Sequence, residues 1–270
     1  LPIALNAMGH EVTIVMPYYK EIADKYKLAD ACGPQTLFSE GKVYHYNIKQ
    51  LHWHGLNILF IDYPEYFDRD GLYTNGYEAY ADNGERFSFF SGCVLSALQA
   101  VSLQPDIIHC HDWHTAMLPF FMAHEKSGFF ADTKTVFTIH NAAFQGVHQL
   151  QDIPYLRHHP AILGQVHGGY INMLQSGIEF AHKITTVSPN YAQELLTDLG
   201  SHGLHDRLVT RANDLSGILN GCDYTQWNPL TDNFLPENYD VENLSGKQTC
   251  KRVLQENAGL TARQQKRGTG

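Results

Sequence analysis

The sequence predicts an α/β protein built on a doubly wound parallel sheet of the Rossmann-like kind, and two observations carry this prediction. First, short apolar runs alternate along the chain with segments whose apolar residues recur at three- and four-residue spacing. Second, apolar runs end abruptly in hydrogen-bonding residues, as at His109 and at His140. Strands and helices repeated in this order favour parallel pairing with right-handed crossovers. The carboxyl ends of such strands open on one crevice, so we expect these polar ends to face a common cleft.

The expected elements are spread along the whole chain. We expect helices over residues 1–8, 84–102, 116–123, 169–182 and 188–199, and strands over 11–16, 43–48, 56–62, 107–108, 135–139, 183–187 and 216–219. The helix over 84–102 is expected to be amphipathic, because its apolar residues repeat at helical spacing. Ser188 and Pro189 suit the N-cap and the first position of the helix that follows them. A helix before the first strand implies a further strand ahead of it, with a Gly-rich phosphate loop at the end of that strand.

The composition excludes several classes of protein. With 270 residues, 43% of them hydrophobic, the chain can bury a sizeable core. Its formal net charge of −9 and its scattered basic residues argue against a nucleic-acid partner and against binding to a membrane surface. No apolar run approaches the roughly 18 residues needed to span a bilayer. The five cysteines show no CxxC spacing, so we expect no disulfide framework, no structural zinc ribbon and a reducing, cytoplasmic location.

The segment from residue 63 to residue 87 is crowded with aromatic side chains, carboxylates, asparagines and glycines. Aromatic faces that stack on sugar rings, beside amides and carboxylates that bond hydroxyl groups, would have this composition. We expect a loop that does not bury itself as ordinary core. The alternative interpretation is an irregular surface loop whose tyrosines pack on the domain.

The run from His109 to His114 (HCHDWH) suggests a metal site, because three imidazoles and a carboxylate can converge on zinc. The run comes close to the HxHxDH pattern of metallo-hydrolases, but its aspartate stands one residue too early. His109 and His111 point the same way only if the strand continues through both. We expect neither a metal nor a cofactor, and a metal-dependent hydrolase that uses this cluster remains an alternative.

A set of motifs extends from residue 1 to about residue 260. They are Leu-Pro followed by Gly-His-Glu-Val, Phe-Asp-Arg, Tyr-Ala-Asp-Asn-Gly-Glu-Arg-Phe, His-Cys-His-Asp-Trp-His-Thr-Ala, Thr-Ile-His-Asn-Ala-Ala-Phe-Gln-Gly, Thr-Thr-Val-Ser-Pro-Asn-Tyr-Ala, Gly-Ile-Leu-Asn-Gly-Cys-Asp-Tyr and Trp-Asn-Pro. In this combination the sequence resembles bacterial glycogen synthases, the retaining ADP-glucose transferases that share a fold with plant starch synthases.

The resemblance implies the N-terminal half of a GT-B glycosyltransferase. A starch-synthase-type catalytic domain would cover residues 1–245, and residues 246–270 would begin the linker to a C-terminal Rossmann-like domain. The implied reaction adds glucose from ADP-glucose to the non-reducing end of an α-1,4-glucan such as glycogen, with retention by same-face attack. The ADP-glucose donor, the glucan acceptor and the C-terminal domain of the same enzyme are therefore the expected partners.

The resemblance also assigns roles to residues that match the family's motifs. His140 corresponds to the residue whose backbone carbonyl lies beside the anomeric carbon, and Asp112 corresponds to a carboxylate of the same cleft that is important for catalysis. Residues near the donor glucose and on the acceptor side are assigned in the same way. Asn141, Tyr73 and Asn220 match the donor positions, and Tyr80 matches the acceptor side.

The chain departs from the family at both ends. The family's Lys-Thr/Val-Gly-Gly-Leu phosphate loop would lie before Leu1, and its second Rossmann-like domain, with the Arg, Lys and Glu that bind diphosphate and glucose, would follow Gly270. We therefore expect the 270-residue chain alone to bind donor poorly and to transfer no glucose. A non-catalytic glucan-binding fragment that uses the loop over 63–87 is the other alternative, and the preference for ADP or UDP stays open.

Overall fold

The computed structural model describes residues 1–39 and 41–260 of the chain. It contains two compact units, Leu1–Leu219 and Asn220–Gly270. The predicted domain boundary at residue 245 stays a prediction, and residues 261–270 of the predicted linker lie outside the described residues. None of the described helices is long and apolar enough to cross a membrane.

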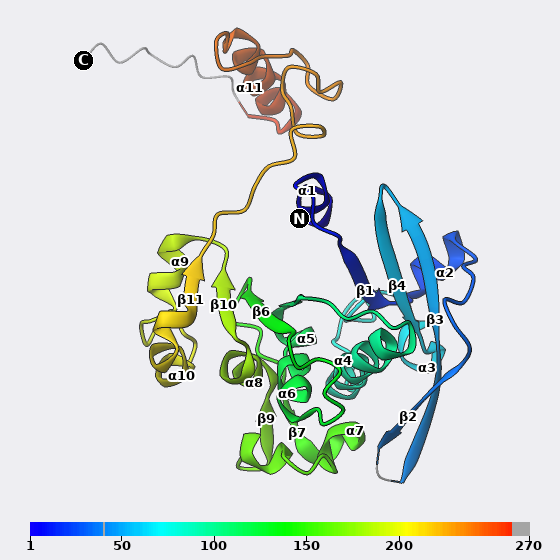
Figure 1. The fold of residues 1–270 in the computed structure, drawn as a ribbon. Coiled ribbons are helices and arrows are strands. Elements are labelled where there is room, and N and C mark those ends of the chain that lie inside the picture. The colour runs from blue at the N-terminus through cyan, green and yellow to red at the C-terminus, as the bar shows by residue number, and fades with distance from the viewer. Residues whose placement is uncertain (40, 261–270) are drawn as a thin grey trace. The chain divides into compact units, whose positions relative to one another are not determined.

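Most elements of the two units are labelled in Figure 1. The helices of the first unit are α1 (Pro2–Ala7), α2 (Lys20–Lys25), α3 (Pro64–Phe67), α4 (Asn83–Ala100), α5 (Asp112–Thr115), α6 (Met117–His124), α7 (Pro154–Arg157), α8 (Met173–Phe180), α9 (Pro189–Glu194) and α10 (His205–Thr210), with 3-10 turns at Leu150–Asp152, Ile162–Gln165 and Ala212–Asp214. Its strands are β1 (Thr13–Pro17), β2 (Gln35–Ser39), β3 (Lys42–Trp53), β4 (Leu56–Asp62), β5 (Ile107–His111), β6 (Lys134–Ile139), β7 (Val147–Gln149), β8 (Val166–His167), β9 (Tyr170–Asn172), β10 (Lys183–Thr186) and β11 (Leu215–Gly217). The second unit contains α11 (Ser245–Asn257).

The predicted parallel α/β sheet is confirmed as one four-stranded sheet in the order β11-β10-β6-β5, with every pair parallel. A second four-stranded sheet has the order β1-β4-β3-β2, in which β1 is parallel to β4 and the other pairs are antiparallel. The strands expected over 43–48 and 56–62 form the antiparallel hairpin β3–β4, whose turn residues His54 and Gly55 have φ of +48° and +77°. Both central residues of a type I′ hairpin turn need positive φ, which is why glycine suits the second position.

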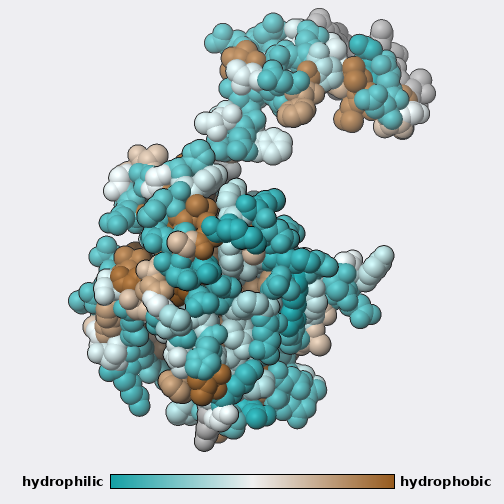
Figure 2. All heavy atoms as spheres, turned by 90° about the vertical axis from the view of Figure 1, so that its right-hand side faces the viewer, coloured by the Kyte–Doolittle hydropathy of each residue, from teal (hydrophilic) through white to brown (hydrophobic). Residues whose placement is uncertain are grey.

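The outer side of the second sheet, β1-β4-β3-β2, is mostly hydrophilic in Figure 2. Side chains alternate along β3, so that Tyr44, Tyr46 and Ile48 are buried while Val43 and His45 are exposed. One hydrophobic core, made of residues from both four-stranded sheets and from α4, α6 and α8, therefore lies on the inner side.

The prediction that α4 is amphipathic is wrong, because 15 of its 18 residues are buried. Its polar side chains are satisfied inside the protein. Ser88 and Ser91 donate to backbone carbonyls one turn earlier, at 2.7 and 2.9 Å. The Glu85 carboxylate accepts from the hydroxyls of Tyr44 and Tyr66 at 2.8 and 2.9 Å. With these partners a helix that carries charges can lie in the core.

The prediction that the segment over 63–87 is not ordinary core is partly wrong. Tyr63, Tyr66 and Phe67 are buried in and beside α3, so the first part of the segment is ordinary core. Tyr77, in contrast, is 98% exposed. The expected exposed loop therefore begins after α3 and extends to α4.

Two helix predictions are confirmed with different bounds. The helix expected from residue 169 begins at Met173, because the preceding residues form β9 and Asn172 serves as the N-cap, accepting the backbone N–H of Gln175 at 3.1 Å. Ser188 caps α9 as predicted and accepts the N–H of Tyr191 at 2.9 Å. This helix ends at Glu194, before the predicted end.

Candidate functional site

The polar ends of two neighbouring strands lie together, as expected from the sequence. β5 continues through His111, so the chain leaves the sheet at Asp112, and β6 ends at Ile139, directly before His140. The Asp112 Oδ1 accepts a hydrogen bond from the backbone N–H of His140 at 2.8 Å. The carboxylate at the end of β5 is thus hydrogen-bonded to the backbone directly after β6.

Asp112 adopts an uncommon backbone conformation, with φ of +52°. This is the left-handed region, which aspartate and asparagine enter more readily than most other residues. Here the chain passes directly from β5 into the short helix α5.

Two further side chains fix the backbone on either side of His140. The Thr186 hydroxyl, at the end of β10, donates to the carbonyl of Ile139 at 2.8 Å. The backbone N–H of Ala142 donates to the hydroxyl of Tyr191 in α9 at 3.0 Å. None of the described residues donates a hydrogen bond to the carbonyl oxygen of His140. The backbone on both sides of His140 is therefore held by neighbouring side chains, and His140 itself is exposed.

Two histidines of β5 lie beside this backbone. The rings of His109 and His111 are 4.3 Å apart, so the strand does continue through both and they share one face. His111 Nδ1 lies 3.1 Å from His140 Nε2, and His109 Nε2 lies 2.6 Å from the Thr138 hydroxyl. Burial, with the nearby His109 and His140, lowers the pKa of His111 to about 4. His111 is therefore neutral at pH 7, and one ring N–H joins the two imidazoles.

The cluster from His109 to His114 does not converge as the metal-site hypothesis requires. Cys110 is buried in the core, where burial raises the pKa of its thiol to about 12. The His114 ring stacks on Trp113, with centroids 4.1 Å apart, instead of joining His111. Among residues 1–39 and 41–260, no group of three or more His, Cys, Asp or Glu side chains is arranged to hold a metal ion.

Tyr73 is a predicted substrate residue that the structure brings close to Asp112 and α5. Its ring stacks on His114 at 4.4 Å with an interplanar angle of 31°, and it also contacts Phe87 at 5.7 Å. Burial and the negative charge of Asp112 raise the pKa of its hydroxyl. The residue is nevertheless 41% exposed, so one side of it is open to a ligand.

Tyr80 lies farther along the same loop. Its backbone N–H donates to the Tyr73 carbonyl at 3.0 Å, and its hydroxyl donates to the carbonyl of Asp70 at 2.7 Å. Its ring faces the guanidinium groups of Arg69 and Arg86, each 5.1 Å from the ring centroid. No described hydrogen bond or ring contact joins Tyr80 to Asp112, so its acceptor-side role stays a prediction.

The two predicted asparagines have different surroundings. Asn141 directly follows His140, and its Oδ1 accepts the backbone N–H of Ala143 at 3.0 Å in a turn after β6. Asn220 is the first residue of the second unit, so its role near the donor also stays a prediction.

Thr186 and Tyr191 are the residues of this site that sequence reasoning missed, together with His111. Both belong to the motif Thr-Thr-Val-Ser-Pro-Asn-Tyr-Ala, one of the motifs that carry the family resemblance, but the resemblance assigns no site residue within it. The order of strands in a parallel sheet is the feature that could have indicated these residues. β10 is the parallel neighbour of β6, so its carboxyl end opens on the same crevice.

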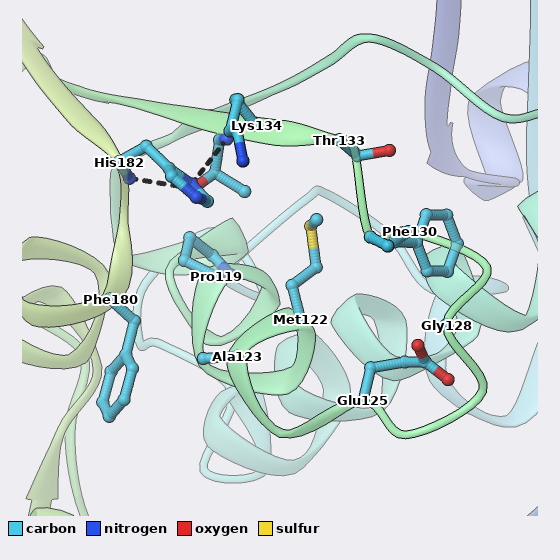
Figure 3. Close-up of a pocket in the computed structure, with 12 residues that line it drawn as sticks. Pro119, Met122, Ala123, Glu125, Gly128, Phe130, Thr133, Lys134, Phe180 and His182 are labelled. Atoms are coloured by element: carbon cyan, nitrogen blue, oxygen red, sulfur yellow. Dashed lines mark hydrogen bonds between the residues drawn. The ribbon is translucent and has the colours of Figure 1, made fainter.

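A cavity of about 380 Å³ lies away from this site, at the start of β6. Lys134, the first residue of β6, lines it, whereas His140 follows the last residue of that strand. Figure 3 shows His182 beside Lys134 and above Pro119; its Nδ1 accepts the N–H of Thr135 at 3.1 Å. None of the predicted site residues lines this cavity.

Comparisons with known proteins agree with the resemblance seen in the sequence. The model of the starch synthase catalytic domain family matches residues 1–210. The chain is 44% identical to the glycogen synthase of Aeromonas salmonicida (strain A449) over 267 residues, which cover 96% of this chain and 54% of that protein. It is 45% identical to the glycogen synthase of Vibrio cholerae serotype O1 (strain ATCC 39541) over 273 residues, with coverage of 96% and 55%.

A solved structure is also similar. It is the catalytic domain of Starch Synthase IV from Arabidopsis thaliana bound to ADP and acarbose, with a TM-score of 0.76 and 30% identity, covering 98% of this chain and 55% of that one. The chain thus spans about half the length of the relatives it matches. The match to the domain model, the sequence identities and the shared fold agree, and the chain belongs to the family of starch synthase catalytic domains.

Proposed function

We propose that the protein to which this chain belongs is a glycogen synthase, a retaining glucosyltransferase that adds glucose from ADP-glucose to the non-reducing end of an α-1,4-glucan. The observation that carries the proposal is the turn after β6, where the Asp112 carboxylate accepts the backbone N–H of His140 and Thr186 and Tyr191 hold the backbone on either side, at the adjoining ends of parallel strands. The similarity to glycogen synthases and to a starch synthase bound to ADP and acarbose supports the choice of donor and acceptor.

The proposed chemistry needs no side-chain nucleophile. As the bond between the anomeric carbon and the phosphate oxygen breaks, positive charge develops on the sugar ring. The His140 carbonyl dipole and the Asp112 charge stabilise this charge in a preorganised site. The 4-hydroxyl of the acceptor forms the new bond on the same face, and its proton passes to the leaving phosphate oxygen. This differs from glycosidases, in which two carboxylates flank the scissile bond.

The remaining predicted residues would orient the two substrates. Tyr73, Asn141 and Asn220 would contact the donor glucose, and Tyr80 would contact the acceptor. Orientation of donor and acceptor is a large share of the barrier to transfer. The five cysteines are free in the structure, which supports a cytoplasmic enzyme.

The test uses the whole open reading frame that contains this chain. Its product should transfer labelled glucose from ADP-glucose to maltoheptaose, and α-amylase should release the label. The 270-residue chain should transfer none, because it spans about half the length of its relatives. UDP-glucose, assayed in parallel, decides the nucleotide. The proposal fails if the full product transfers glucose from neither donor.

A non-catalytic glucan-binding role has one observation in its favour, which is the exposure of Tyr77 and Tyr73 in the loop before α4. Affinity electrophoresis in gels that contain glycogen tests it on the 270-residue chain. Retarded migration that Tyr73→Ala and Tyr80→Ala abolish would support this role. Retardation that survives both substitutions would place any glucan contact elsewhere.

A further inference from the structure

Arg86, in α4, is fully buried in the protein core, with 0% of its surface exposed. Its Nε donates to the carbonyl of Tyr66 at 2.8 Å, and its Nη1 donates to the Oδ1 of Asn83 at 2.5 Å. Its Nη2 donates to the carbonyl of Leu72 at 3.3 Å. These acceptors lie in and around the loop that carries the predicted substrate tyrosines, so one side chain ties that loop to the central helix.

Three aromatic rings also face this guanidinium. They belong to Phe67, Tyr80 and Phe87, with centroids 5.5, 5.1 and 5.3 Å from the guanidinium carbon. Contacts of a cation with aromatic rings are strongest when both are shielded from water. Tyr80 is therefore held by its ring from one side and by its hydroxyl bond to Asp70 from the other.

A short chain of hydrogen bonds continues from Arg86 to Tyr73. The Oδ1 of Asn83 accepts from Arg86, and its Nδ2 donates to the Tyr73 carbonyl at 2.9 Å. The Tyr73 ring then stacks on His114, in the helix that begins at Asp112. Direct contacts therefore connect the buried Arg86 to α5, the helix that begins at Asp112.

We propose that Arg86 is a positioning residue, which through Asn83 and through its own ring contacts holds Tyr73 and Tyr80 where they meet the substrates. Its part in catalysis rests on the proposed function, whereas its control of the two tyrosines rests on the contacts alone. Lysine cannot replace it, because an ammonium group lacks the planar fork that reaches three acceptors while its faces meet aromatic rings.

Kinetics of the full-length product test the catalytic part. Arg86→Lys should raise the KM for donor or acceptor about tenfold, the size expected when a stacked or hydrogen-bonded substrate contact is lost. Arg211→Lys is the matched control. Arg211 donates to the carbonyls of Ile178, Glu179 and Ala181 at the end of α8, at 2.6 to 2.9 Å, and touches none of the loop. It should leave both KM values within about twofold.

A double-mutant cycle separates positioning from general loss of stability. Arg86→Lys should add less to the kinetic defect of Tyr73→Ala than it costs in the wild type, because the two changes share the Tyr73 contact and only the part that acts through Tyr80 remains. Arg211→Lys should add its own small effect in full. Equal and additive effects of the two arginine substitutions would overturn the proposal. Should Arg86→Lys fail to fold, Asn83→Asp keeps the acceptor for Arg86, removes the donor to Tyr73 and serves in its place.

Proton NMR of the 270-residue chain tests the positioning without any activity. The His114 ring protons sense the stacked Tyr73 ring, so Arg86→Lys and Asn83→Asp should move their resonances and Arg211→Lys should not. Unmoved resonances would refute the positioning even in an active enzyme. Moved resonances, together with a full-length product that transfers glucose from neither donor, would leave the positioning intact and refute the proposed function.

Discussion

Asp112 meets three demands at one position: a left-handed backbone, an acceptor for the His140 N–H and a negative charge in the site. Asp112→Asn keeps the first two and removes the third. We expect its kcat in the full-length product to fall about 10²-fold or more, while the free energy of unfolding stays close to that of the wild type. Asp112→Ala should in addition lose about 1–2 kcal/mol, because alanine is strained at positive φ. Urea unfolding and initial rates measure the two effects, and wild-type kcat in Asp112→Asn would remove Asp112 from the chemistry.

Two half-buried histidines, His111 and His114, should make the fold sensitive to acid. Burial and the neighbouring histidines lower the pKa of His111 to about 4. Burial and the positive charge of Arg86 lower the pKa of His114 to about 4. An unfolded histidine titrates near its usual value of 6.5 and so binds protons that the folded protein does not accept. Stability should therefore be complete above about pH 6.5 and should fall as the pH is lowered towards 4.

Melting temperatures between pH 7.5 and pH 4.5 measure this loss. His114→Phe keeps an aromatic ring between Tyr73 and Trp113 and cannot be protonated, so it should flatten the curve. His167→Phe, at an exposed position, is the control and should leave the slope unchanged. A wild-type slope in His114→Phe would show that its protonation does not drive the loss.

At the level of elements, the close approach of α8 to the parallel sheet depends on one glycine. A Cβ added to Gly177 would lie 2.7 Å from the Phe137 ring and 3.0 Å from the Cβ of Ala116. Gly177→Ala should gain up to about 1 kcal/mol from helix propensity but lose about 1–3 kcal/mol from overpacking, so we expect net destabilisation.

Gly164→Ala is the matched control for this substitution, because nothing lies within 4 Å of its added Cβ. It should be neutral or stabilising by about 0.4–1 kcal/mol. Urea unfolding of both variants measures the difference. If both behave alike, α8 can move away from β6 without cost, and the packing argument is wrong.

The same elements show what the sequence could and could not predict. The strand ends at Asp112 and His140 could be found because the topology of a parallel sheet brings adjacent strand ends together. The burial of α4 could not, because Glu85 is satisfied by Tyr44, 41 residues earlier in the chain. Likewise, nothing local marks Arg86 as buried, since a charged residue in a helix is usually on its solvent face. Polar groups buried by distant partners are invisible to periodicity.

At the level of the whole molecule, the two units differ in how much they bury. The first contains a core of aromatic and aliphatic residues from both four-stranded sheets. Among the described residues of the second, 220–260, only Gly246 is buried, while Trp227 is 68% and Phe234 is 97% exposed. Buried apolar area is the main source of folding free energy, so the second unit has little with which to offset the entropy of ordering its chain.

Hydrogen exchange of the 270-residue chain should reveal this difference directly. Amides of β6 and β10 lie in the interior of the parallel sheet and should exchange only through large-scale opening, whereas those of 220–260 should exchange through local fluctuations. Even α11 should show weak protection, because its hydrogen bonds lie on a helix with a single buried residue. Trypsin should accordingly cut at Lys247, Lys251 or Arg252 before it cuts within residues 1–219. Protection in α11 equal to that of β6 would mean that the second unit is stabilised by something other than its own buried surface.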